Sequence, residues 1–87
     1  MSITRRDFIA LAEGDEVHGP DGQVVCTVVG CHNRGEGNDH EVAVIFSGEK
    51  KETWIQWDPS GKYPFVSDSQ TKSAIMAEKN LTVVKAA

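Results

Sequence analysis

The sequence has little cysteine, few aromatic residues and no long hydrophobic run. Two cysteines, Cys26 and Cys31, are too few for a disulfide scaffold, so we expect a reducing compartment. No apolar run approaches the ~20 residues of a membrane span, and we expect no membrane partner. Arg5 and Arg6 resemble an export signal, but acids from Glu13 onward replace the apolar segment of ~7–15 residues that such a signal needs. A cytoplasmic protein is expected.

The chain is also short, with 87 residues, which predicts one domain over residues 1–87 and a thin core. Its 39% hydrophobic and 25% charged residues are typical of a globular protein. A net charge of −4 argues against bulk electrostatic attraction to nucleic acid or to anionic membranes. A domain of this size has little room for a preorganised catalytic cleft, so we expect a protein that is not an enzyme.

Two short helices are predicted. Thr4 and Asp7 have the spacing of a capping box, and the helix that follows is expected to end at Gly14. A second helix is predicted to start at a cap on Asp68 or Ser69 and to run through Glu78.

The rest of the chain alternates apolar and polar residues with a period of two, which predicts short strands. A turn at 19–22 contains proline and glycine, and Gly30 is expected to allow a bulge. Residues 62–67 are expected to be extended or irregular, because Pro64 lacks a backbone donor. The predicted strands are 15–18, 23–31, 40–47, 51–57 and 81–85. A mainly β fold, an antiparallel sheet closed into a small barrel, removes the edges of such strands.

Four stretches support this barrel: Gly14-Asp15-Glu16-Val17, Gly22 with the valine-rich stretch after it, Val42-Ala43-Val44-Ile45-Phe46-Ser47-Gly48, and Thr53-Trp54-Ile55. Together they resemble the SH3-like small barrels, Tudor-type and KOW-type included. The resemblance covers roughly residues 14–58 and the strand at 81–85. It implies an SH3-like barrel of about five strands, here with an additional N-terminal helix and a longer segment between residues 58 and 79. Such barrels have unrelated binding roles, so the resemblance names no partner.

The aromatic residues are concentrated, since four of the six lie between positions 54 and 65. Alternation places Ile55 and Trp57 on one face of a strand and Trp54 on the other, so one indole is expected near the surface. Aromatic walls support a peptide, surround a cation or stack single-stranded bases. The predicted partner-binding residues are Trp54, Trp57, Tyr63, Lys50, Lys51 and Lys62. The alternative is that these rings fill the core, because a small core needs large side chains.

Acidic residues are concentrated in the first half of the chain. Residues 1–48 carry eight acids against three arginines, whereas residues 49–87 carry five acids against six lysines. If strand pairing brings the acids together, they form an acidic rim that engages a basic partner or imitates nucleic acid. Its members are Glu13, Asp15, Glu16, Asp21, Glu36, Asp39 and Glu41. The alternative is that these charges only keep a small domain soluble.

The cysteines and histidines do not have the spacing of a metal site. Zinc sites use four nitrogen or sulfur ligands, usually in two close pairs, and Cys26 and Cys31 are too far apart for a CxxC pair. Cys26 lies on the apolar face of its predicted strand, which is typical of a small core residue. Adding His18, His32 and His40 does not complete a recognisable set. We expect no metal and no cofactor.

These patterns favour a non-enzymatic binding or adaptor module that docks a protein or peptide through the aromatic surface. One alternative is an acidic inhibitor or nucleic-acid mimic, as small accessory proteins of phages and mobile elements often are. A further alternative is a protein that binds single-stranded nucleic acid directly. The chain is expected to be a monomer, or a homodimer that pairs strand edges at 15–18 or 81–85.

Overall fold

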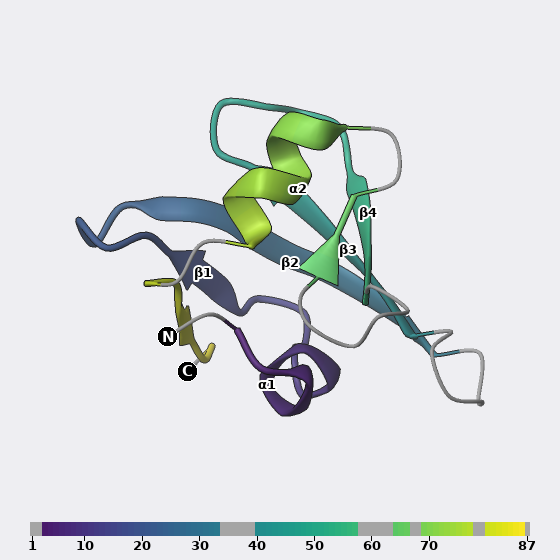
Figure 1. Ribbon diagram of the computed structural model, residues 1–87. Helices are drawn as coiled ribbons and strands as arrows, with labels where there is room; N and C mark the ends of the chain where they lie inside the picture. The colour runs from purple at the N-terminus through teal and green to yellow at the C-terminus, as the bar shows by residue number, and fades with distance from the viewer. Residues whose placement is uncertain (1–2, 34–39, 58–63, 67–68, 78–79, 87) are drawn as a thin grey trace.

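The computed structural model describes residues 3–33, 40–57, 64–66, 69–77 and 80–86 (Figure 1). The protein is mainly β with two short helices, as the sequence predicts. The elements in chain order are α1 (Arg5–Ile9), β1 (Glu16–His18), β2 (Val24–Asn33), β3 (His40–Phe46), β4 (Thr53–Trp57), β5 (Pro64–Phe65), α2 (Gln70–Met76) and β6 (Thr82–Val84). None of these helices is long and apolar enough to cross a membrane.

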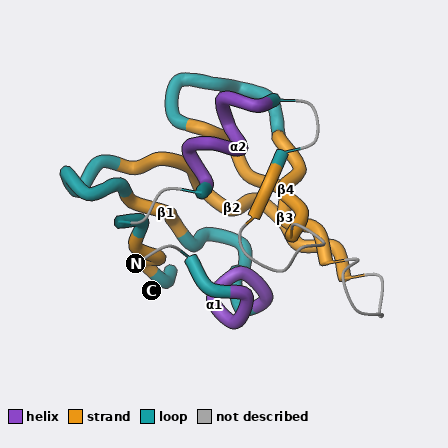
Figure 2. Tube along the Cα trace, viewed as in Figure 1, coloured by secondary structure: helices purple, strands orange, loops and turns teal. Residues whose placement is uncertain are grey.

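The strands form one six-stranded antiparallel sheet in the order β5-β4-β3-β2-β1-β6, drawn in orange in Figure 2. Within the described residues β5 and β6 are opposite edges that no ladder joins, so the sheet is open where a closed barrel was expected. The edge strands have only two and three residues. The segment predicted to close the barrel, 81–85, instead pairs with β1. Residues 15–18 are therefore covered on both sides, so of the two predicted free edges, 15–18 and 81–85, only the second is an edge of the described sheet, as β6.

The predicted turn and bulge are both present. The amide of Gly22 donates to the carbonyl of Gly19 at 2.9 Å, and Gly22 has a positive φ of 83° that favours glycine. The register between β2 and β3 shifts between Val28 and Gly30, as a bulge requires. These features let β2 bend while it pairs with β1 on one side and with β3 on the other.

Both helices begin where the sequence predicts and end earlier. The Thr4 hydroxyl accepts a hydrogen bond from the Asp7 amide at 3.1 Å, and the Thr4 amide donates to the Asp7 carboxylate at 3.4 Å. The Ser69 hydroxyl caps α2 in the same way. Helix α1 ends at Ile9 rather than near Gly14, because the amide of Ala12 turns to the Asp15 carboxylate at 2.9 Å.

The core lies on one face of the sheet and under both helices, which occupy separate ends of the molecule in Figure 1. The Phe8 ring of α1 packs against Trp57 of β4 with centroids 5.6 Å apart. Each large apolar side chain buried there contributes roughly 1.5–3 kcal/mol. The strand residues of the core are Val17, Cys26, Val28, Val42, Val44, Phe46, Ile55 and Trp57; the covering residues are Ile3, Phe8, Leu11, Val66, Met76 and Leu81.

Candidate functional site

Strand β4 divides the two tryptophans between the two faces of the sheet. Ile55 and Trp57 point into the core, whereas Trp54 is 46% exposed. This confirms the predicted alternation. A large aromatic side chain that is half exposed is a common anchor for a partner, because its burial on binding removes much apolar surface from water.

Trp54 belongs to the side of the sheet that faces away from the core. We call this side the outer face. The ladder places Trp54 opposite Ala43 and Gln56 opposite Glu41, and a second row runs from Val84 through Glu16 and Thr27 to Ile45. Val84 is also exposed, at 41%. By ladder position the outer face includes Glu16, His18, Thr27, His32, Glu41, Ala43, Ile45, Trp54, Gln56, Thr82 and Val84.

The pairing of β3 with β4 determines which side chains lie next to Trp54. The residue directly opposite Trp54 on β3 is Ala43, whose small side chain is buried. The Gln56 amide donates to Glu41 Oε1 at 2.8 Å across the same pair of strands. This hydrogen bond holds the Glu41 carboxylate on the outer face, at a diagonal position ~7–8 Å from Trp54.

The charges on the strands have one sign. None of the six strands contains a lysine or an arginine, and their carboxylates are those of Glu16 and Glu41. Both lie on the outer face. The lysines of the described residues lie in turns, in α2 and in the C-terminal segment. The outer face therefore carries apolar and uncharged polar side chains together with two carboxylates, and among the described residues it has no lysine or arginine to balance their negative charge.

The residues of the predicted aromatic binding surface do not lie together in the structure. Trp57 is 4% exposed and packs in the core, so its inclusion in the binding surface is wrong, and the alternative of a core ring holds for this residue. Lys50 and Lys51 are exposed in the connection between β3 and β4. Lys62 and Tyr63 lie outside the described residues. What remains of the predicted surface in the described chain is Trp54 with the two lysines nearby.

The residues of the predicted acidic rim do not lie together either. Glu13 and Asp21 are exposed, whereas Glu16 accepts a hydrogen bond from His18 at 2.9 Å if that ring nitrogen is protonated. Glu41 is two strands away from Glu16. Glu36 and Asp39 lie outside the described residues. Asp15 does not belong to a rim, because it is only 2% exposed.

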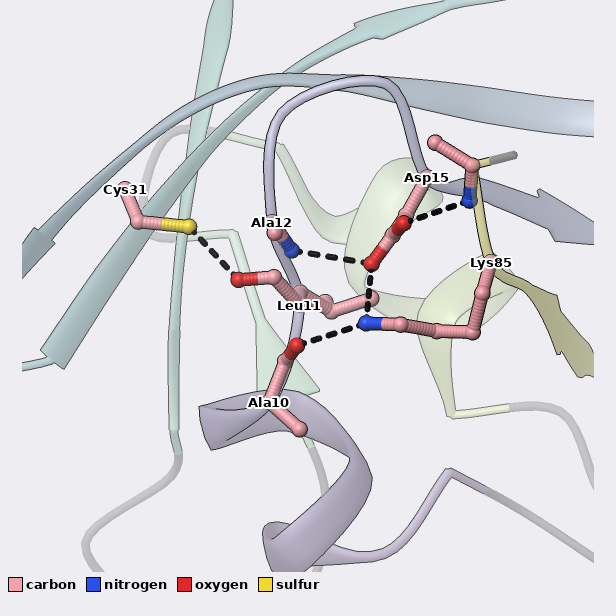
Figure 3. Close-up of polar contacts among 7 residues, drawn as sticks. Ala10, Leu11, Ala12, Asp15, Cys31 and Lys85 are labelled. Carbon is pink, nitrogen blue, oxygen red and sulfur yellow. Dashed lines mark hydrogen bonds and ion pairs between the residues drawn. The ribbon is translucent and has the colours of Figure 1, made fainter.

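The buried carboxylate of Asp15 is instead the centre of a partly exposed hydrogen-bond network that sequence reasoning missed (Figure 3). Its carboxylate accepts from the amide of Ala12 at 2.9 Å, from the amide of Ala86 at 2.9 Å and from the Lys85 ammonium at 2.5 Å. The same ammonium donates to the carbonyl of Ala10 at 2.8 Å. The network ties the end of α1 to the C-terminal segment. No local pattern signals it, since Asp15 and Lys85 are 70 positions apart.

The network lowers the pKa of Asp15 from an ordinary 3.8 to about 2. The Lys85 hydrogen bond is the largest cause, the Ala86 amide is next, and burial acts in the opposite direction. The carboxylate is therefore ionised at neutral pH and acts as a structural anion. It has no open position for a substrate, because its neighbours are the chain's own amides and Lys85.

The two cysteines differ in environment. Cys26 is buried on the inner face, as expected for a small core residue, and burial raises the pKa of its thiol to about 12. Cys31 is exposed, and its thiol donates to the carbonyl of Leu11 at 2.8 Å. Burial, followed by the nearby Asp15 charge, raises the pKa of Cys31 as well. Both thiols are protonated at neutral pH, which is unfavourable for a nucleophile or a metal ligand.

An open groove of about 570 Å³ lies between the β1–β2 turn and β6. Its walls are His18, Gly19, Pro20, Gly22, Asn80, Leu81, Thr82 and Val84. His18 is the one titratable side chain among these residues, and it pairs with Glu16. No group of three histidine, cysteine or carboxylate side chains within the described ranges is arranged to hold a metal ion.

Comparison of the chain with protein-family models, with curated proteins and with solved structures finds no match.

Proposed function

We propose that the protein is a non-enzymatic binding module that docks a protein or peptide partner on the outer face of its sheet, with Trp54 as the anchor. The observation that carries this proposal is the exposure of Trp54, at 46%, on a face opposite the core. Aromatic side chains that become buried at the centre of an interface supply much of its binding energy. Lys50 and Lys51, at one end of β4, remain members of the proposed surface.

An SH3-like barrel remains a prediction of the sequence. The mainly β chain with its short strands and tight turns is compatible with the resemblance, but the described sheet is open. The proposed function does not depend on the fold family, because related small folds bind unrelated partners. It depends on the face to which Trp54 belongs.

The test is selection of binding peptides from a displayed random 12-residue library against the immobilised protein. Peptides that bind through the outer face should lose about tenfold or more in affinity for Trp54→Ala. Ile9→Ala is the matched control, because Ile9 of α1 is 45% exposed and lies away from the outer face. Peptides that bind both variants as tightly as the wild type would contradict the proposal.

A further inference from the structure

The charge of the outer face identifies the kind of partner. We infer that the face docks a segment carrying arginine or lysine on either side of apolar residues, an inference that rests on the proposed function above. The partner is a basic, partly apolar peptide segment of another protein.

The first argument is the sign of the charge on the strands. Their carboxylates, Glu16 and Glu41, both lie on the outer face, and the strands contain no lysine or arginine. The basic residues of the strands are histidines: His18 Nε2 lies 2.9 Å from Glu16 Oε1, and His32 is opposite Glu41 on the ladder. A segment with cations meets attraction at both positions, whereas an acidic segment or a nucleic-acid backbone meets repulsion at both.

The second argument is the position of Trp54 beside Glu41. The two lie on a diagonal of the same face, ~7–8 Å apart by ladder geometry. A guanidinium or ammonium stacked on the indole is attracted by the ring and by the carboxylate together. The hydrogen bond from Gln56 to Glu41 already holds this carboxylate in place, so less side-chain freedom is lost on binding.

The third argument is the apolar space between the two carboxylates. Ala43, Ile45 and Thr27 lie between them on the ladder and carry no charge; Ile45 and Thr27 are partly exposed, whereas Ala43 is buried. Glu41 and Glu16 are two strands and four register positions apart, which corresponds to ~16 Å. An extended peptide of about five residues covers this distance. Because side chains of an extended peptide alternate between its two faces, the expected ligand has two basic residues four or six positions apart, with apolar residues between them.

The connection between β3 and β4 does not reverse this bias. Lys50 and Lys51 are flanked by Glu49 and Glu52, so the connection has no net charge. Glu49 in turn pairs with Lys72 of α2 at 2.7 Å. Glu16 lies at the same strand end as these lysines, since its row contains Ile45 and the next β3 residue, Val44, pairs with Thr53. It is on β1, however, three strands away from β4, so a segment that reaches Glu16 from Trp54 leaves the lysines sideways across the sheet.

The test uses the same random 12-residue library and reads the composition of the peptides that depend on Trp54. We expect enrichment in arginine or lysine at two positions four or six apart. Binding of these peptides should weaken about threefold in Glu41→Gln and in Glu16→Gln, as expected for removing one unit charge ~7 Å from a cation in water. It should also weaken with added salt.

Glu13→Gln and Asp21→Asn are matched controls, because each removes one exposed carboxylate outside the outer face. Equal weakening in these controls would show general charge attraction and overturn the inference. Trp54-dependent peptides without excess positive charge would overturn the inference and leave the proposed function standing. A library that yields no Trp54-dependent peptide contradicts the proposed function itself. Circular dichroism of each variant separates loss of binding from loss of fold.

Discussion

The carboxylate of Asp15 and the ammonium of Lys85 are 70 positions apart in the chain and 2.5 Å apart in the structure. Asp15 is buried, whereas the Lys85 side chain is 57% exposed. Two backbone amides, those of Ala12 and Ala86, complete the surroundings of the carboxylate. This contact joins the segment after α1 to the segment after β6, and so holds β6 against β1.

Replacing Asp15 with asparagine should lower the free energy of unfolding by about 2–3 kcal/mol at pH 7, because a buried charge-assisted network loses its charge and one acceptor. Urea denaturation followed by circular dichroism measures the change. Asp21→Asn is the control and should change stability by less than about 0.5 kcal/mol, since Asp21 is exposed in a turn. Equal effects of the two substitutions would remove the structural role of Asp15.

The low pKa of Asp15 predicts an acid-dependent loss of stability. A carboxylate with a pKa of about 2 in the folded state and about 3.8 when unfolded stabilises the protein above pH 4, and this contribution disappears as the pH falls toward 2. Its size is about 1–2 kcal/mol, reduced by the solvent exposure of Lys85. The stability difference between wild type and Asp15→Asn should therefore shrink across this window. A difference that stays constant from pH 7 to pH 2 contradicts the assignment.

The two tryptophans should respond in opposite ways to truncation. Trp57→Ala should cost about 3–5 kcal/mol, because it leaves a cavity beside Phe8. Trp54→Ala should cost less than about 1 kcal/mol, because the side chain is half exposed. Thermal and urea unfolding of both variants measure this contrast.

Trp57→Phe refines the comparison. Within the described residues, the Trp57 Nε1 hydrogen is a buried donor without a partner. Phenylalanine removes this donor and keeps most of the ring, so its cost should be clearly smaller than that of alanine. A phenylalanine variant as unstable as the alanine variant would indicate that Nε1 does have a partner.

The cysteines should differ in alkylation. Iodoacetamide should modify Cys31 first and slowly, and Cys26 only after unfolding, because Cys26 is buried with a pKa of about 12. Mass spectrometry of the native and urea-unfolded protein identifies the modified residue. Cys31→Ser is the control and should leave the native protein unmodified. Rapid modification of Cys26 in the native protein would contradict its place in the core.

The local patterns predicted the elements well, because each had a local physical cause. The Thr4 capping box, the turn at 19–22, the bulge at Gly30 and the alternation of β4 all depend on residues close in sequence. The predicted closure of the barrel was wrong for the described sheet, because closure depends on whether edge strands that are distant in sequence are long enough to meet. Two-residue β5 and three-residue β6 remain apart at opposite edges of the described sheet.

The candidate site was predicted only in part for the same reason. Alternation identified one exposed indole, and it is Trp54. The sequence did not indicate that Asp15 would be buried, because its partners Lys85 and Ala86 come from the other end of the chain. Nor did it indicate that Glu16 and Glu41 share a face, which follows from the register of β1, β2 and β3.

The most direct measurement of the central claim is a nuclear magnetic resonance titration of the ¹⁵N-labelled protein with the tightest Trp54-dependent peptide from the library. The account predicts that the largest shifts fall on the Trp54 indole and on the amides of Ala43, Ile45 and Gln56, which lie on the outer face. Largest shifts at the β1–β2 turn residues Gly19 and Gly22, or on α2, with the Trp54 indole unchanged, would contradict it.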